Sequence, residues 1–175
     1  MQRELILYIA MSLDGYIATK TNDIGFLETV SQDGEDYGYN EFVSNIDTVI
    51  MGRKTYSKVL AMGHTPHPDK ETYIVSRTPQ KTIGNTKFYN GNLSELVKEL
   101  KQQQGKNIYC DGGAEIVTLL LKDNLIDQLY LSVIPVFLGD GIRLFQDGRP
   151  QAQWHMVSAK QFPKGLVQLH YTLKK

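Results

Sequence analysis

The sequence has little of what several classes of protein require. Its single cysteine, Cys110, excludes an internal disulfide and a cysteine-based zinc site. No stretch approaches the roughly 18 consecutive apolar residues of a membrane-spanning helix, and the apolar run Leu5–Leu7 is too short for a signal peptide. The 19 Lys and Arg residues balance 19 Asp and Glu residues, so no net charge favours nucleic acid. We therefore expect a cytoplasmic protein that binds neither a membrane nor nucleic acid.

The chain has the length and composition of one globular domain. It has 175 residues, of which 41% are hydrophobic and 22% are charged, so we treat residues 1–175 as a single domain. Short apolar runs predict strands at Leu5–Met11, Thr48–Met51, Glu71–Ser76, Thr86–Tyr89, Lys106–Cys110, Ile126–Val136, Trp154–Lys160 and Gly165–Leu173. Helices are predicted at Tyr37–Asn45, Lys54–Met62, Leu93–Gln103 and Ala114–Lys122. This alternation predicts an α/β fold with antiparallel strands at the C-terminal edge.

Three predicted strands end in glycine or small polar residues before a predicted helix. These ends are Met51–Thr55, Ser76–Thr78 and Asp111–Ala114. In an α/β sheet such ends meet at one edge, where helix N-termini present free backbone N–H groups that favour phosphate. Taken alone, the Gly-Gly pair can be a tight turn, and the arginines at the other two ends can be solvated surface residues. The combination favours a dinucleotide that carries several phosphates.

The segments around these strand ends resemble one enzyme superfamily. Val49–Tyr56 (VIMGRKTY) and Ile74–Arg77 (IVSR) are similar to cofactor-binding segments of dihydrofolate reductases. Ile9–Ala18, Cys110–Glu115 and Val133–Gly141 are similar to the C-terminal reductase domain of the bifunctional riboflavin-biosynthesis deaminase–reductase. The resemblance covers nearly the whole chain, with its segments in the family order. It implies a dihydrofolate-reductase-like three-layer fold, a mixed and mainly parallel sheet flanked by helices, with NADPH as the cofactor.

The resemblance also assigns residues to the cofactor. Ala10 would contact the nicotinamide carboxamide through its backbone, and the loop that begins at Ile17 and ends at Phe26 would close over the nicotinamide. The phosphates would be held at the two helix starts by Gly52, Arg53, Lys54 and Thr55 together with Gly112, Gly113, Ala114 and Glu115. Ser76 and Arg77 would flank the 2′-phosphate of the adenosine. A guanidinium can bind that phosphate bidentately, whereas a ribose 2′-hydroxyl needs an acidic partner, so we expect NADPH to be preferred over NADH.

The residues expected to act on the substrate are Asp36, Asp111 and Ser132. Dihydrofolate reductases place a buried carboxylate on the first helix, and Asp36, which precedes Met51 by 15 positions, matches its spacing. Ser132 matches the hydroxyl residue that supports that acid. The adjacent Glu35 is an alternative, and Asp36 could instead cap a helix, whereas burial should raise the pKa of a functional acid. In the riboflavin enzymes the residue matching Asp111 contacts substrate, although Asp111 could also cap the following helix.

Two observations set limits on this resemblance. Between Gly15 and Glu71 the only arginine is Arg53, so the arginines with which riboflavin reductases bind the ribose phosphate of their substrate are missing. His64 and His67 lie in a proline-containing loop with no other histidine or cysteine near in sequence, so we expect no metal site.

The long apolar segment Ile126–Phe137 suggests self-association. Pro135 within it predicts an edge strand or a bulge, and an exposed apolar edge is a liability unless it is covered. Related reductase domains pair through this region, so we expect a homodimer.

These observations leave three candidate functions. The first is an NADPH-dependent reductase that resembles 5-amino-6-(5-phosphoribosylamino)uracil reductase of riboflavin biosynthesis and transfers hydride to a pyrimidine- or pteridine-type substrate. The second is a dihydrofolate reductase, which predicts efficient turnover of dihydrofolate. The third is a non-catalytic NADPH-binding dimer, which predicts binding without turnover.

Overall fold

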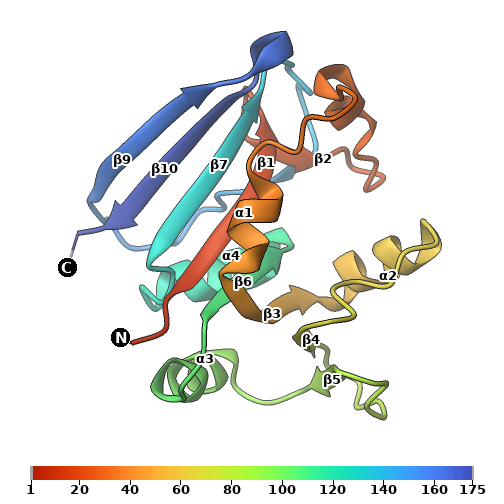
Figure 1. Ribbon diagram of the computed structural model, residues 1–175, viewed down its shortest axis with the longest axis vertical. Coiled ribbons are helices and arrows are strands. Elements are labelled where there is room, and N and C mark those ends of the chain that lie inside the picture. The colour runs from red at the N-terminus through yellow and green to blue at the C-terminus, as the bar shows by residue number, and fades with distance from the viewer. Residues whose placement is uncertain (1, 175) are drawn as a thin grey trace.

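The computed structural model describes residues 2–174, which form a large sheet of eight strands and a small sheet of two (Figure 1). The large sheet contains β1 (Leu5–Ser12), β3 (Ile46–Gly52), β4 (Glu71–Val75), β5 (Thr86–Tyr89), β6 (Asn107–Gly112), β7 (Gln128–Ile134), β9 (Trp154–Gln161) and β10 (Val167–Leu173). The small sheet contains β2 (Tyr16–Ala18) and β8 (Ile142–Arg143). The helices are α1 (Tyr39–Ser44), α2 (Arg53–Ala61), α3 (Leu93–Gln102) and α4 (Ala114–Lys122), with 3-10 turns η1 (Gly25–Val30) and η2 (Pro163–Gly165).

The strand order of the large sheet confirms the predicted α/β fold. The order is β5-β4-β3-β6-β1-β7-β10-β9, and neighbouring strands are parallel from β5 to β7. β10 runs antiparallel to β7 and to β9, which makes the predicted C-terminal antiparallel pair. Because parallel strands point the same way, the carboxyl ends of β1, β3, β4 and β6 lie along one edge of the sheet.

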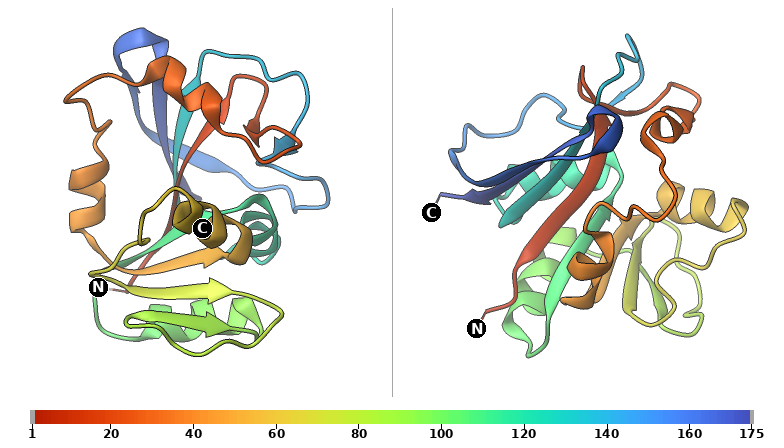
Figure 2. Two further views of the ribbon diagram at one scale, coloured as in Figure 1. Left: turned by 90° about the vertical axis from the view of Figure 1, so that its right-hand side faces the viewer. Right: turned by 45° about the horizontal axis from the view of Figure 1, so that its top comes forward.

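Alternating side chains of the central strands fill two hydrophobic cores. Leu5 and Leu7 of β1 pack on one face with apolar residues of α3 and α4. Ile6 lies on the other face, in a cluster with Phe42 of α1 and with Tyr56 of α2 against its margin. The helices therefore form a layer on each face of the sheet. Figure 2 shows α2 beside the β4–β5 end of the sheet, far from the β9–β10 hairpin.

The expectation that Pro135 marks an edge strand or a bulge within Ile126–Phe137 is wrong. β7 lies between β1 and β10 and is hydrogen-bonded to both. The strand ends at Ile134, one residue before Pro135, because a proline cannot donate a ladder hydrogen bond. Proline therefore marks the end of an interior strand here.

Two short strands lie where the sequence predicted only loops. β2 and η1 belong to the segment expected to close over a nicotinamide, and β2 pairs with β8. Gly141 permits this approach, since its φ is 150° and a Cβ there would lie 2.2 Å from the carbonyl oxygen of Ala18. Strands of two or three residues are too short to leave a periodic pattern. Within residues 2–174, no helix is long and apolar enough to cross a membrane.

Candidate active site

The starts of α2 and α4 lie side by side at the carboxyl edge of the sheet. The register places Met51 of β3 beside Gly112 of β6, and each strand runs directly into its helix. The N-cap residues of the two helices are Gly52 and Gly113, and a glycine has no side chain with which to cap free backbone N–H groups. The two helix dipoles therefore direct partial positive charge to the same place, which suits a phosphorylated ligand.

The backbones of the two helix starts approach closely because glycine occupies the contact. A Cβ added at Gly52 would lie 3.3 Å from Cγ1 of Ile116 and 3.6 Å from the backbone nitrogen of Gly113. A Cβ added at Gly113 would lie 3.4 Å from Oγ1 of Thr55. We refer to Gly52–Thr55 together with Gly112–Glu115 as the cradle. It contains the eight helix-start residues that the sequence assigned to the phosphates.

Cationic side chains flank the cradle and reach into solvent. Arg53 and Lys54 are exposed in the first turn of α2. The ammonium of Lys54 lies 3.5 Å from a carboxylate oxygen of Glu115 in the first turn of α4. This exposed ion pair contributes little to stability, so its lysine can turn to an anionic ligand at small cost.

The third strand end contributes differently from the other two. Ser76 follows β4 and is buried, and its hydroxyl accepts a hydrogen bond from the nitrogen of Thr78 at 3.2 Å and donates to its carbonyl oxygen at 3.0 Å. This local turn leads into a loop, so the helix expected after Ser76–Thr78 is absent from the described chain. The exposed guanidinium of Arg77 remains available beside the end of β4.

Ala10 lies on a stretch of β1 that β6 does not reach. β1 pairs with β7 from Ile6 to Ser12, whereas its register with β6 covers only Leu5–Leu7. The carbonyl oxygen of Tyr8 lies 3.2 Å from the hydroxyl oxygen of Tyr109, so that carbonyl points toward β6. Backbone groups two residues apart on a strand point the same way, so the backbone of Ala10 also faces this edge. Ile17 of β2 is half-buried against the core that contains Leu5.

The expected buried acid on the first helix is not found, and this corrects the interpretation of Asp36. Asp36 is exposed, and its carboxylate accepts hydrogen bonds from the backbone nitrogens of Gly38 at 2.9 Å and Asn40 at 3.0 Å. These hydrogen bonds, led by that of Asn40, lower the pKa of Asp36, whereas burial would have raised it. The alternative, Glu35, accepts from the nitrogen of Tyr37 at 2.8 Å and is only half-buried. Both side chains satisfy backbone N–H groups near the start of α1.

Ser132 is buried, but its partner is an amide rather than an acid. The side-chain nitrogen of Gln168 lies 3.3 Å from Oγ of Ser132, 3.0 Å from the hydroxyl of Tyr8 and 3.2 Å from the carbonyl oxygen of Tyr37. Burial raises the pKa of Tyr8, so its hydroxyl stays protonated at neutral pH. The expected support of Asp36 by Ser132 is therefore wrong, because the neutral Gln168 takes that place.

The side chain of Asp111 lies on the face of the sheet that carries Tyr109. It immediately precedes Gly112, and its side chain is 23% exposed. One carboxylate oxygen accepts a hydrogen bond from the hydroxyl of Tyr109 at 2.7 Å, and the other lies 3.3 Å from Nε2 of His67. The N-cap of α4 is Gly113, so Asp111 does not cap that helix.

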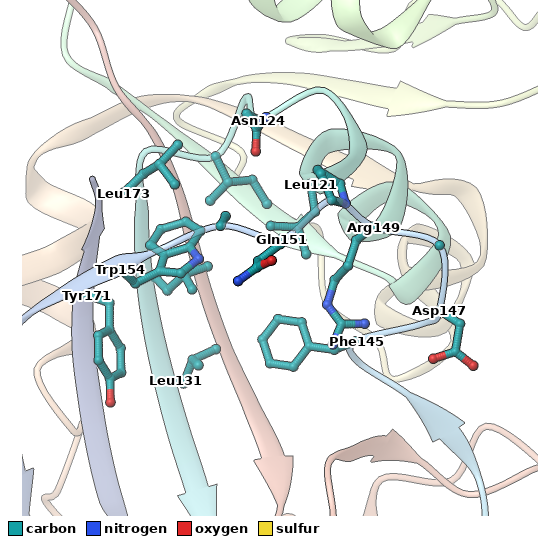
Figure 3. Close-up of a pocket in the computed structure, with 15 residues that line it drawn as sticks. Leu121, Asn124, Leu131, Phe145, Asp147, Arg149, Gln151, Trp154, Tyr171 and Leu173 are labelled. Atoms are coloured by element: carbon teal, nitrogen blue, oxygen red, sulfur yellow. The ribbon is translucent and has the colours of Figure 1, made fainter. Parts of the chain in front are cut away.

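A cavity lies between β7, β10 and the segment before β9, on the face of the sheet opposite to Tyr109, and Figure 3 shows the residues that line it. It has a volume of about 750 Å³ and is lined mainly by apolar side chains, among them Leu129, Leu131, Phe145, Trp154 and Tyr171. These residues pack with the core that contains Leu5, whereas the Ser132 hydroxyl lies on the other face of β7. The cavity includes none of the expected site residues. Among residues 2–174 there is also no cluster of three potential metal ligands.

The family of the chain follows from comparison with known proteins. The family described as the RibD C-terminal domain matches residues 3–168. The chain belongs to this family. It is 39% identical over 173 residues to the uncharacterized protein YwjB of Bacillus subtilis strain 168, covering 98% of each chain. A shorter match of 60 residues, 40% identical, covers 33% of this chain and 24% of a 2,5-diamino-6-ribosylamino-4(3H)-pyrimidinone 5′-phosphate reductase of Debaryomyces hansenii.

Solved structures confirm the fold. A candidate riboflavin biosynthesis protein from Shewanella sp. PV-4 superposes with a TM-score of 0.88 at 26% identity, covering 100% of both chains. Dihydrofolate reductase of Enterococcus faecalis, solved with NADP(H), superposes with a TM-score of 0.72 at 17% identity, covering 100% of this chain and 99% of that one. The fold of this RibD C-terminal domain family member is therefore dihydrofolate-reductase-like, and the family is one of reductases.

Sequence reasoning missed four side chains that surround the expected substrate residues. Tyr8 and Tyr109 could have been found, because each lies two residues before a named site residue on the same strand face. Gln168 comes from an antiparallel neighbour whose register the sequence does not give. His67 comes from the loop after α2, and no pattern in the sequence pairs it with Asp111.

Proposed function

We propose that this RibD C-terminal domain family member is an NADPH-dependent reductase. It would transfer hydride to an imine-like carbon of a pyrimidine- or pteridine-type substrate, as a 5-amino-6-(5-phosphoribosylamino)uracil reductase does. The observation that carries the proposal is the close approach of two uncapped helix starts, Gly52 and Gly113, at the carboxyl edge of one sheet.

The residues of the cradle suit NADPH in chemistry and in shape. Glycine leaves the backbone bare where a Cβ would be tightly packed, as a pyrophosphate pressed against two helix starts requires. Arg53 and Lys54 would neutralise phosphate charge, and Arg77 would bind the adenosine 2′-phosphate. The backbone of Ala10 would hold the nicotinamide amide, and the segment from Ile17 would exclude water from it. When bound, the dinucleotide supplies the hydride.

The test of the cofactor assignment compares two dinucleotides that differ by one phosphate. Arg77→Ala should raise the dissociation constant for NADPH about ten- to hundredfold, since a charge-assisted hydrogen bond contributes about 1.5–3 kcal/mol. The affinity of the Arg77→Ala variant for NADH should hardly change. Lys81→Ala, which removes an exposed cation four residues away, is the matched control and should affect neither. Equal losses for both dinucleotides in Arg77→Ala would contradict the assignment.

The substrate assignment is tested by NADPH oxidation with different heterocycles. The exposed position of Asp36 removes the observation that most favoured a dihydrofolate reductase. We therefore expect turnover with an aminopyrimidine, such as 2,5-diamino-6-ribosylamino-4(3H)-pyrimidinone 5′-phosphate, to exceed turnover with dihydrofolate. Tight NADPH binding without oxidation by any pyrimidine or pterin would instead favour the non-catalytic role.

We also propose that the chain forms a homodimer, although not through an edge of β7. β9 lies at one end of the sheet with only β10 beside it, and Met156 and Val157 on it are 50% and 51% exposed. A strand edge of this kind is usually covered. Sedimentation velocity should show a dimer that Val157→Lys weakens, while Leu119→Lys on α4, 48% exposed, serves as the control. A monomer at micromolar concentration would contradict this expectation.

A further inference from the structure

His67 lies against Asp111, the residue that immediately precedes the cradle, although nothing in the sequence pattern placed it there. It belongs to the loop between α2 and β4, and its backbone is left-handed with a φ of 43°. Its Nε2 lies 3.3 Å from Oδ2 of Asp111, and its ring meets the ring of Tyr109 edge-on, with centroids 5.5 Å apart. The side chain of His67 is only 12% exposed. A loop 44 residues away in sequence therefore reaches over the end of β6 to make this contact.

Asp111 is held by two donors from two different elements. The hydroxyl of Tyr109 donates to Oδ1 at 2.7 Å, and burial together with the charge of Asp111 holds the Tyr109 pKa well above its usual value. Tyr109 therefore remains a donor at neutral pH. A carboxylate has about four acceptor sites, so Asp111 keeps acceptor capacity after both contacts are made.

The neighbouring charged residues of the loop have other partners. The ammonium of Lys70 is buried and donates to the carbonyl oxygen of Ile46 at 3.2 Å and to Asp69 at 3.1 Å. His64 is exposed. Among the described side chains, His67 is thus the one group capable of positive charge for which a contact with Asp111 is recorded.

We propose that His67 is a positioning residue of the reductase proposed above. By donating from Nε2, it fixes Asp111 so that the carboxylate accepts a hydrogen bond from an N–H or O–H group of the heterocyclic substrate. The inference rests on the proposed function, because it assigns the substrate to the end of β6 that lies next to the cradle. It adds a residue that acts through Asp111, not one that touches the reacting atoms.

Two substitutions separate the hydrogen bond from the ring contact. His67→Phe keeps a ring against Tyr109 but removes the donor, whereas His67→Gln keeps a side-chain N–H donor and removes the ring. With NADPH and 2,5-diamino-6-ribosylamino-4(3H)-pyrimidinone 5′-phosphate, His67→Phe should raise KM about ten- to hundredfold, the range for losing a hydrogen bond to a charged group. Its kcat per NADPH-binding site should change little. His67→Gln should recover most of the loss, and His64→Phe is the matched control.

A purely structural role would give a different result. If His67→Phe only impairs folding, the number of NADPH-binding sites falls and KM stays unchanged, and this result would overturn the proposal. A His67→Gln variant with a KM as high as that of His67→Phe would overturn it too. A fall in KM would show that His67 blocks Asp111 instead of orienting it. In an Asp111→Asn background, His67→Phe should add less than about threefold to KM, because residues in one hydrogen-bond network are not additive. Full additivity would also overturn the proposal.

Failure of the proposed function can be recognised separately. If no pyrimidine or pterin supports NADPH oxidation by the unaltered chain, the proposed reaction is wrong. The contact between His67 and Asp111 is then tested by NMR of protein labelled with 15N-histidine. Asp111→Asn should shift the Nε2 resonance of His67 and leave that of His64 in place. The same His67 resonance should move when the aminopyrimidine is added with NADP+. Absence of the first shift would overturn the pairing of His67 with Asp111 whatever the reaction, and absence of the second while the aminopyrimidine is bound would overturn the role of His67 in substrate binding.

Discussion

Replacing Gly52 with alanine tests the cradle directly. Gly52 has φ −76° and ψ 151°, an extended conformation that alanine adopts without strain. Any effect must therefore come from the added Cβ and not from the backbone. That Cβ would lie 3.3 Å from Cγ1 of Ile116, 3.6 Å from the nitrogen of Gly113 and 3.7 Å from the carbonyl oxygen of Gly112.

The size of the effect follows from these distances. Carbon atoms pack best at about 3.5–4.0 Å, so Ile116 has to give way by a few tenths of an ångström, and we expect α4 to move with it. Overpacking of this kind costs about 1–3 kcal/mol of stability. The same movement would lengthen the hydrogen bonds from both helix starts to a shared pyrophosphate. Losing the equivalent of one charge-assisted hydrogen bond, about 1.5–3 kcal/mol, raises the dissociation constant of NADPH about ten- to hundredfold.

Calorimetric titration with NADPH and urea unfolding measure the two effects separately. Ile116→Ala removes the Cγ1 atom that the new Cβ approaches. In that background Gly52→Ala should therefore weaken NADPH binding much less than it does alone. If Gly52→Ala loses stability but binds NADPH with unchanged affinity, the contact is real and the cofactor does not lie there. That result would refute the reasoning.

Two further predictions concern stability and reactivity away from the cradle. Lys101→Met should lower the free energy of unfolding by about 3–5 kcal/mol in urea titrations, because the ammonium of Lys101 lies 2.5 Å from the buried carboxylate of Asp127. Lys98→Met, exposed on the same helix, should change it little. Burial raises the pKa of the Cys110 thiol to about 12, so the native protein should react with Ellman's reagent at about pH 8 only slowly, and rapidly once unfolded. Rapid reaction of the native thiol would contradict its burial.

The convergence of the two helix starts could be predicted from the sequence because it depends on where buried parallel strands end. Once Met51 and Cys110 are assigned to buried parallel strands, the glycines that follow them must reach the same edge of the sheet. The function proposed for them depends on backbone N–H groups, so no side-chain direction has to be known. The helix at Ala114–Lys122 and the strand at Thr86–Tyr89 have the predicted bounds.

The substrate half could not be predicted in the same way because it depends on contacts between distant segments. His67 reaches Asp111 from a loop in which a proline stands on either side of it, so the loop has no regular pattern from which its path could be predicted. Gln168 reaches Ser132 through the antiparallel register of β10 with β7, two strands that are not consecutive in the sequence. Asp36 has the sequence spacing of the acid found in dihydrofolate reductases. Its carboxylate nevertheless stays at the surface, because it accepts hydrogen bonds from free backbone N–H groups near the start of α1.

The position of Asp36 leads to a prediction about proton delivery. Backbone hydrogen bonds lower its pKa from the ordinary value of 3.8, so it is ionised at neutral pH and has no proton to give. A carboxylate whose pKa is lowered in the folded state stabilises the fold at pH values above its unfolded-state pKa. This stabilisation is lost as the pH falls through the folded-state pKa. Asp36→Asn should therefore lose less stability on acidification, measured by urea unfolding at acid and neutral pH.

The same variant should leave the pH profile of kcat/KM for NADPH oxidation in place. Tyr39, at the start of α1, does not supply the proton in place of Asp36. Burial and the charge of Asp111 raise the pKa of Tyr39 to about 12, so it is a hydrogen-bond donor but a poor source of protons at neutral pH. The proton then has to come from solvent or from a group beside Asp111, and neither route passes through Asp36. A large drop in kcat/KM on Asp36→Asn, with NADPH affinity unchanged, would return Asp36 to the role of proton donor and require the loop around α1 to close inward when substrate binds.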